Sequence, residues 1–330
     1  MMRRITKRVA LLIGAIAAVL PLIGIDVSAQ SQAYPTKTIR FVVPYVPSGG
    51  VDFVARTLAE YLSKTMGHSV IVDNRPGGST NIGTELVARA APDGYTFLVA
   101  SVPTSVNQTL FRNLRFNIIT DFIHISLLST APNILVVHPS LPVKSINELI
   151  AYAKARPGQL TFGSAGIGTS NHLSGELFKI MAGIDMLHVP YKGGGAAVTE
   201  LLGGHISMYF ATPPSVMSHV QSGKLRALGV TSEKRSASVP DIPTISESGL
   251  PGFDQSAWHG LFAPVGTPVP IIAKLSAEVV KVLRMPDVEK RFNSQAVDVI
   301  ASSPEEFAAF IRQDVAKYEK LIKAANIHVE

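Results

Sequence analysis

The sequence contains no cysteine among its 330 residues. This absence excludes a structural disulfide, a thiol nucleophile, a thiolate metal site and a lipid-modified cysteine at a signal cleavage point. A chain without cysteine suits an oxidising compartment such as the periplasm. The nine histidines are scattered, and none forms a helical pair at metal-ligand spacing. We therefore expect neither a metal site nor a cofactor.

Basic runs interleaved with aromatic residues are also lacking, and no segment has a helix-turn-helix pattern. Nucleic acid is therefore not an expected partner. The formal net charge of +6 is concentrated at the start of the chain, and without the leader 26 basic and 23 acidic residues remain. Such a small positive balance favours anionic ligands only weakly.

The one long apolar run of the sequence lies at its beginning. Four basic residues between positions 3 and 8 precede an almost uncharged segment from 9 to 25. This pattern is typical of a secretory signal peptide, and the small residues that end at Ala29 predict cleavage there, with Ala33 as a second candidate. An uncleaved membrane anchor is the alternative, but Pro21 interrupts the run, which is short for a span of about 20 residues. Adjacent arginines leave twin-arginine export open.

From Thr38 onward, short apolar runs alternate with helical periodicity and Gly/Pro punctuation. This alternation predicts an α/β fold, with mostly parallel sheets flanked by helices. About 300 mature residues exceed one core, so we expect two lobes. Lobe I is predicted to be discontinuous, at 34–131 and 231–330, and lobe II to span 132–230. Two connections between the lobes would form a hinge.

Local signals mark two helix starts. Ser145 and Glu148 have the spacing of a capping box. Ser303 is a suitable N-cap, Pro304 suits the first helical position, and Glu306 can bond back to the cap. We expect helices to begin at both places.

A strand, a glycine-rich loop and a helix recur at 39–66 and at 160–181. Each loop would place free backbone N–H groups at a helix N-terminus, where the helix dipole also favours an anion. An ordinary strand-to-helix turn is the simpler interpretation of the first loop. The second loop crowds hydroxyls, an amide and an imidazole onto one helix start. His172 alone is more often a capping histidine, so we assign binding to the whole loop.

Enzymatic interpretations of these loops fail on spacing. A nucleophile elbow would need glycine where Phe162 stands. A dinucleotide fingerprint would need glycine in place of Asn171, and no phosphate-binding lysine follows either loop. We therefore expect no catalytic residues. An exported carboxylate-acting enzyme remains the alternative from another class, and it would need an acid/base pair in the cleft.

At these loops the chain resembles the Bug family, the periplasmic receptors of tripartite tricarboxylate transporters. The resemblance runs from Tyr34 to the last helix. Its segments occur in one order: 43–56, Asp73-Asn74-Arg75-Pro76-Gly77, 90–95, 163–173, 189–194 and Leu201-Leu202-Gly203-Gly204.

The resemblance implies a two-lobed, Venus-flytrap fold of the type II periplasmic-binding class, with the ligand between the lobes. It also implies that a ligand carboxylate lies between the two glycine-rich loops. By position, these contacts fall on Tyr45, Ser48, Gly49 and Asp52 in the first loop and on Ser164, Ala165, Gly166, Gly168, Thr169 and Ser170 in the second. Gly50 and His172 complete the candidate set from the loops.

The sequence departs from the family pattern where the rest of the ligand would lie. Ser48 replaces the usual glycine, Glu200 the usual aspartate, and Ala211 an aspartate or asparagine. Tyr191, Glu200, Phe210 and Thr212 are the candidates for this distal part of the site, although Phe210 ends a strand and is equally a core candidate.

The function implied is that of a monomeric receptor. It would capture a small organic carboxylate by lobe closure and deliver it to the membrane subunits of a tripartite transporter. A ligand-sensing subunit of a signalling system is an alternative with the same fold. The ligand's identity stays open, because di- and tricarboxylates, amino acids and aromatic acids all satisfy a one-carboxylate anchor.

Overall fold

The computed structural model describes residues 34–47, 49–191 and 193–328. The predicted signal peptide and its cleavage point at Ala29 lie outside the described residues, as does Ser48. Residues Pro35–Glu330 form one compact unit, and everything below concerns this unit. Each helix in the described ranges is too short or too polar to cross a membrane.

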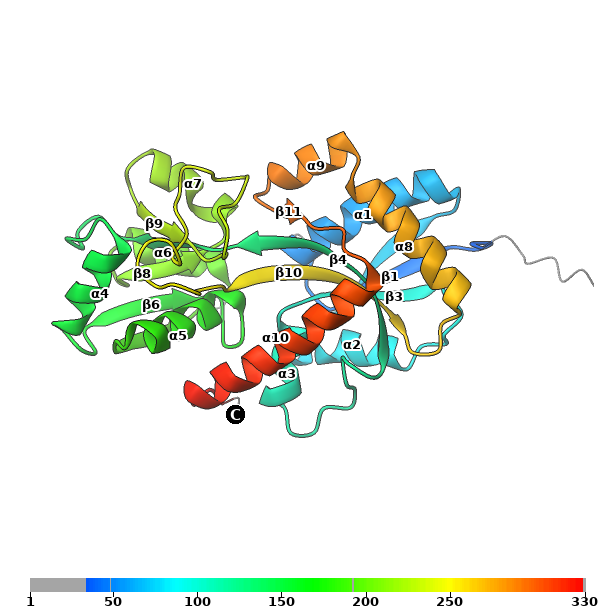
Figure 1. The fold of residues 1–330 in the computed structure, drawn as a ribbon, viewed down its shortest axis with the longest axis horizontal. Coiled ribbons are helices and arrows are strands. Elements are labelled where there is room, and N and C mark those ends of the chain that lie inside the picture. Colours follow the sequence, from blue (N-terminus) through cyan, green and yellow to red (C-terminus); the bar gives the residue numbers. More distant parts are fainter. Residues whose placement is uncertain (1–33, 48, 192, 329–330) are drawn as a thin grey trace, which may run out of the picture. The chain divides into compact units, whose positions relative to one another are not determined.

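Two sheets organise this unit (Figure 1). The first has the strand order β11-β4-β10-β3-β1-β2. Its strands come from both ends of the unit: β1 (Ile39–Val43), β2 (Val70–Asn74), β3 (Thr96–Ser101), β4 (Phe122–Pro132), β10 (Ser256–Pro264) and β11 (Asp298–Val299). The accompanying helices are α1 (Gly50–Met66), α2 (Asn81–Ala88), α3 (Pro103–Leu110), α8 (Val269–Leu283), α9 (Pro286–Asn293) and α10 (Pro304–Ala324), with a 3-10 turn at Gly78–Thr80.

The second sheet has the order β7-β6-β8-β5-β9 and comes from the middle of the chain. Its strands are β5 (Ile134–Val137), β6 (Leu160–Ser164), β7 (Met186–Pro190), β8 (Met208–Ala211) and β9 (Arg226–Val230). Its helices are α4 (Ile146–Lys154), α5 (Ser170–Ala182), α6 (Gly194–Leu202) and α7 (Pro213–Gln221).

The predicted α/β fold is confirmed, but both sheets are mixed rather than mostly parallel. In the first, β1 is parallel to β2 and β3, whereas β10 is antiparallel to β3 and β4. In the second, β6 is parallel to β7 and β8, whereas β5 is antiparallel to β8 and β9. Parallel neighbours need a crossover connection, usually a helix. The antiparallel pairs arise where the chain runs from one sheet into the other.

The two sheets are joined by strands that lie side by side. β4 and β10 pair along their whole length, and only Asn133 separates β4 from β5. At this junction the Asn133 N–H donates to Thr231 Oγ1 (2.8 Å), and the Thr231 N–H returns a bond to Asn133 O (2.9 Å). Gln255 N–H donates to Thr231 O (2.8 Å). All three residues are fully buried, so both connections are held together by one set of hydrogen bonds.

Each sheet is covered on its two faces. Along β5, Leu135 and Val137 join the core shared with α4 and α5, while Ile134 and Val136 join the core shared with α6 and α7. This period of two is the normal geometry of a strand buried on both faces. In the first sheet, Trp258 packs toward α10, and its Nε1–H donates to Asp314 Oδ2 (2.8 Å).

Candidate functional site

The first glycine-rich loop connects β1 to α1 and is braced from β2. Gly49 is the N-cap of α1 and provides no side-chain cap. The Asn74 side chain donates to Tyr45 O (3.1 Å) and to Asp52 Oδ1 (2.9 Å), so one amide ties both ends of the loop together. Arg56 donates to Asp52 Oδ2 (2.9 Å). The buried Asp52 therefore stiffens the loop, and Asn74 is a bracing residue that the sequence analysis did not single out.

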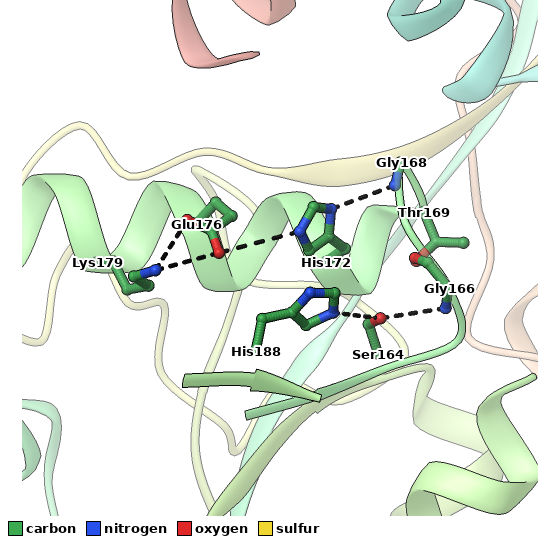
Figure 2. Close-up of polar contacts among 8 residues, drawn as sticks. All are labelled: Ser164, Gly166, Gly168, Thr169, His172, Glu176, Lys179 and His188. Carbon is green, nitrogen blue, oxygen red and sulfur yellow. Dashed lines mark hydrogen bonds and ion pairs between the residues drawn. The ribbon is translucent and has the colours of Figure 1, made fainter. Parts of the chain in front are cut away.

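The second loop connects β6 to α5 and is braced by two histidines (Figure 2). Gly168 N–H donates to His172 Nδ1 (3.2 Å). Gly166 N–H donates to Ser164 Oγ (3.1 Å), which also shares a hydrogen bond with His188 Nε2 (2.7 Å). Two of the loop's N–H groups are thus used internally. His172, predicted among the ligand contacts, lies buried behind the loop and holds it.

The start of α5 keeps its N–H groups available. Thr169 is the N-cap, but its Oγ1 donates to Gly166 O (2.7 Å) and makes no cap bond. The helical ladder begins where Leu173 N–H donates to Thr169 O (3.0 Å). The three preceding N–H groups, at 170–172, belong to the first turn, which lacks intrahelical partners. Together with the helix dipole, they give this helix start the arrangement that favours an anion.

A cavity of about 180 Å³, which we call the loop cavity, lies where the two loops meet. It brings together the predicted residues Tyr45, Gly168 and Thr169. The remaining lining residues were not predicted: Ser79, Thr80, Pro103, Asn107, Leu110, Phe111 and Ile167. None of the lining residues is charged.

Two features of the loop cavity point to a ligand. Thr80 has a positive φ of 79°, which is uncommon for a residue with a side chain. Its buried Oγ1 has no hydrogen-bond partner in the described part of the chain. Asn107 secures the adjoining turn by donating to Ser79 O (2.7 Å) and Asn81 Oδ1 (2.8 Å). Strained backbone and orphaned polar atoms concentrate at binding sites.

A second cavity, of about 550 Å³, lies beside the start of α1, and we call it the β10 cavity. Its lining includes the predicted residues Gly49, Gly50 and Thr212. The other lining residues are Val51, Phe53, Ser101, Ala131, Pro213, Pro214, Ser215, Ala257, His259, Gln295, Ala296 and Val297. The two cavities share no lining residue, but their linings come close together where the Tyr45 side chain of the first lies near the backbone of Ser101 of the second.

The remaining predicted residues line neither cavity. Phe210 is fully buried and packs on Phe178, with ring centroids 5.8 Å apart, so it belongs to the core. Glu200 lies on α6 and contacts His205 Nδ1 (3.1 Å). Tyr191 N–H donates to Ser164 O (3.0 Å), which places Tyr191 beside the second loop.

Four further predicted residues belong to the second loop and the first turn of α5, and none of them lines either cavity: Ser164, Ala165, Gly166 and Ser170. A larger hollow than these two cavities is an open groove of about 790 Å³, which we call the Arg112 groove. It lies between the chain after α3 and the end of α10, and its basic lining includes Arg112, Arg115 and Lys323. It shares Leu110 and Phe111 with the loop cavity but contains neither glycine-rich loop.

The bracing histidines are neutral at neutral pH. Burial lowers the pKa of His172 to about 3 and that of His188 to about 4, and their ring centroids are 4.1 Å apart. His124 and His259 are also buried, and desolvation lowers the pKa of each to about 4.

These shifts predict loss of stability in mild acid. Each folded pKa lies below the unfolded value of about 6.5, so the unfolded chain binds more protons between about pH 6.5 and pH 4. Each such histidine destabilises the fold by up to about 1.4 kcal/mol per pH unit in this window. Two buried carboxyl groups oppose this trend, because desolvation raises the pKa of Asp314 to about 6 and also raises the pKa of Glu176, but they are two groups against four.

Urea unfolding at pH 7.5, 6 and 5 measures this dependence. We expect the free energy of unfolding to fall steadily below pH 6.5. The slope should be smaller in His172→Gln. His205→Gln, at a side chain that is 69% exposed, is the control for loss of a surface histidine. An unfolding free energy that stays constant from pH 7.5 to 5 would contradict the assignment of neutral, buried imidazoles.

Comparison with known proteins gives one consistent result. The family described as the tripartite tricarboxylate transporter family receptor matches residues 54–327. Protein BugT of Bordetella pertussis is 35% identical over 302 residues, which cover 91% of this chain and 93% of BugT. Among solved structures, an R. palustris protein with adipate is 34% identical with a TM-score of 0.78, covering 89% of this chain and 99% of that one. The periplasmic binding protein BugD is also 34% identical, with a TM-score of 0.75 and coverage of 90% and 100%.

Proposed function

Because the chain belongs to the tripartite tricarboxylate transporter receptor family, whose members include periplasmic solute-binding proteins, we propose that it captures a small organic carboxylate and delivers it to the membrane subunits of such a transporter. The observation that carries this proposal is the loop cavity. There the uncapped start of α5 meets Tyr45 and the unpartnered hydroxyl of Thr80.

The carboxylate lies at the N-terminus of α5 in this proposal. The N–H groups of residues 170–172 donate to it, and the helix dipole adds favourable electrostatics. Burial raises the pKa of Tyr45 above its ordinary value, so this side chain is a neutral phenol that contributes no opposing charge. His172 and His188 act behind the loop by fixing the backbone that carries these donors.

Closure of two lobes completes the capture. Lobe I comprises 34–131 and 231–330, and lobe II comprises 132–230. The first lobe contributes Tyr45 and Thr80, and the second contributes the start of α5. A ligand that bridges both halves binds the closed form more tightly than the open form, and this difference in affinity shifts the population toward the closed form. The Asn133 junction also reaches α5, since Asn171 Nδ2 donates to Asn133 Oδ1 (3.2 Å).

The protein acts in the periplasm as a monomer and catalyses no reaction in this proposal. It follows export with cleavage after Ala29, and no nucleic acid or cofactor takes part. Within the described residues, no three His, Asp or Glu side chains gather in a way that could hold a metal ion. The closed receptor presents the bound acid to the transporter. The transporter recognises the closed shape, and no reaction is needed.

A thermal-unfolding screen tests the proposal. The protein is recovered from the periplasmic fraction, and its N-terminal residue identifies the cleavage point. It is then heated with a panel of organic acids and with their methyl esters and amides. An acid at one hundred times its dissociation constant adds about 2.7 kcal/mol of stability. We expect some acids to raise the melting temperature without being chemically converted, and their esters to have no effect. Chemical conversion of a stabilising acid, or stabilisation by no acid, would contradict the receptor function.

A further inference from the structure

The β10 cavity is built on a floor of small side chains. On β10, Ala257 and His259 point to the same face, because residues two apart in a strand share a face, and both line this cavity. Ala257 lies opposite Ala131 of β4, and His259 lies opposite Ser101 of β3. Because Ala131, Ala257 and Ser101 are small, this floor leaves room beside His259 for the body of a ligand whose carboxylate is bound in the loop cavity.

The lining of this cavity offers no charge to a second anionic group. It contains no Lys, Arg, Asp or Glu among the described residues. His259 is its one titratable side chain, and burial lowers the pKa of His259 to about 4. Its Nδ1 is engaged with Ser129 Oγ (3.0 Å). The neutral imidazole can serve a neutral polar group, but it supplies no positive charge.

The start of α7, which borders the cavity, also lacks the donors that an anion needs. Its first two positions are Pro213 and Pro214, and proline has no backbone N–H. Ser215 N–H and Ser215 Oγ both donate to Thr212 O, at 3.0 and 2.7 Å. This helix N-terminus therefore does not form the anion site that helix starts otherwise provide.

The start of α1 also borders the cavity, and His259 lies beside it. The imidazole Nε2 lies 3.6 Å from the position that a Cβ atom of Gly50 would take. A second carboxylate in the cavity would lose its hydration and would gain only this terminus, whose first turn already carries the Asp52 carboxylate. An uncharged group of the same size avoids that cost.

We propose that the receptor selects monocarboxylates with an uncharged, largely apolar body, such as aromatic or medium-chain aliphatic acids, and that this body occupies the β10 cavity. The inference rests on the proposed carboxylate-receptor function and narrows its ligand class. It distinguishes this chain from the R. palustris neighbour solved with the dicarboxylate adipate.

Isothermal titration of matched pairs tests the charge preference. The pairs are hexanoate with adipate and benzoate with terephthalate, at pH 7.5 and one ionic strength. We expect the monoacid of at least one pair to bind tenfold or more tightly than its diacid. Equal or tighter binding of the diacids would overturn the inference while leaving the receptor function intact. Failure of all four to bind, when other carboxylates do, would overturn the ligand class, and failure of every carboxylate would overturn the receptor function itself.

Two substitutions test the location. Gln295→Arg places a cation in the cavity lining from an exposed position, and we expect it to shift the diacid-to-monoacid affinity ratio tenfold toward the diacid, whereas the uncharged Gln295→Met does not. Ala257→Leu fills the floor and should weaken the preferred monoacid at least tenfold. Ala151→Leu, on the exposed face of α4, is the matched control and should not change the affinity. An unaltered ratio in Gln295→Arg, together with wild-type affinity in Ala257→Leu, would place the ligand body elsewhere.

Discussion

Thr169→Asp is expected to weaken carboxylate binding at least a hundredfold while the protein stays folded. Aspartate is a preferred N-cap, and its side chain accepts hydrogen bonds from the N–H groups of the first helical turn. Those at 170–172 are the donors that we assign to the ligand. A carboxylate built into the protein would occupy them and repel the ligand. A hundredfold loss corresponds to about 2.8 kcal/mol of binding free energy.

Matched variants separate charge from cap geometry. Thr169→Asn introduces a side chain of nearly the same shape as aspartate but without its charge. This variant should bind the ligand at least tenfold more tightly than the aspartate variant. Thr169→Ser keeps the hydroxyl that donates to Gly166 O and should bind within threefold of the original protein. Calorimetric titration gives the affinities, and thermal unfolding verifies the fold. Undiminished binding in Thr169→Asp would show that the ligand carboxylate does not lie at the start of α5.

Gly175→Ala is expected to cost about 2 kcal/mol or more of unfolding free energy, because of overpacking. In an exposed helix the same change stabilises by about 0.5–1 kcal/mol. Here a Cβ atom would lie 2.2 Å from Phe162 Cε2, so α5 cannot keep its place on β6. Phe162 is fully buried and stacks on His188 (4.9 Å between centroids), which limits its freedom to move aside. Because α5 carries the second loop, ligand affinity should fall as well.

Urea unfolding measures this effect against a helical glycine with free space. Gly195 in α6 has no heavy atom within 4 Å of its Cβ position, so Gly195→Ala should be neutral or slightly stabilising. Adding Phe162→Leu to Gly175→Ala should restore part of the lost stability, since two residues in contact are energetically coupled. Equal stability of the Gly175 and Gly195 variants would mean that the close packing of α5 on Phe162 does not exist.

Both helix starts predicted from local signals are confirmed, but only one of the two capping boxes forms completely. Ser303 Oγ accepts from Glu306 N–H (3.2 Å), and Ser303 N–H donates to Glu306 Oε2 (2.8 Å), so the predicted start of α10 is confirmed. At Ser145 the cap bond also forms, but Glu148 accepts from Lys144 N–H instead of from the cap residue. Such motifs depend on local geometry, which sequence spacing determines.

Strand pairing was harder to predict. Neither β4 nor β10 was predicted from the sequence, although these are the strands that join the two sheets. In β10, apolar residues follow one another on both faces, and such a run has no period that distinguishes a strand from a buried helix. The antiparallel direction of β10 depends on how the chain passes from one sheet to the other, and no local sequence pattern predicts that path.

The two glycine-rich loops could be named from the sequence, whereas the contacts of individual side chains could not. Asp52 and His172 have the chemistry of ligand contacts, yet both brace the loops. Thr80 lines the loop cavity and His259 lines the β10 cavity from outside the two glycine-rich loops, and residue type alone does not reveal these positions. The unusual φ of Thr80 has no signal in the sequence.

The most direct test of the receptor account is a crystal structure of the protein with the acid that stabilises it most. We predict that the ligand carboxylate lies 2.7–3.2 Å from N–H groups of residues 170–172, the ordinary hydrogen-bond range, with Tyr45 and Thr80 beside it. A carboxylate bound instead to Arg112 and Arg115 in the Arg112 groove would contradict the account, because capture would then not involve the two glycine-rich loops.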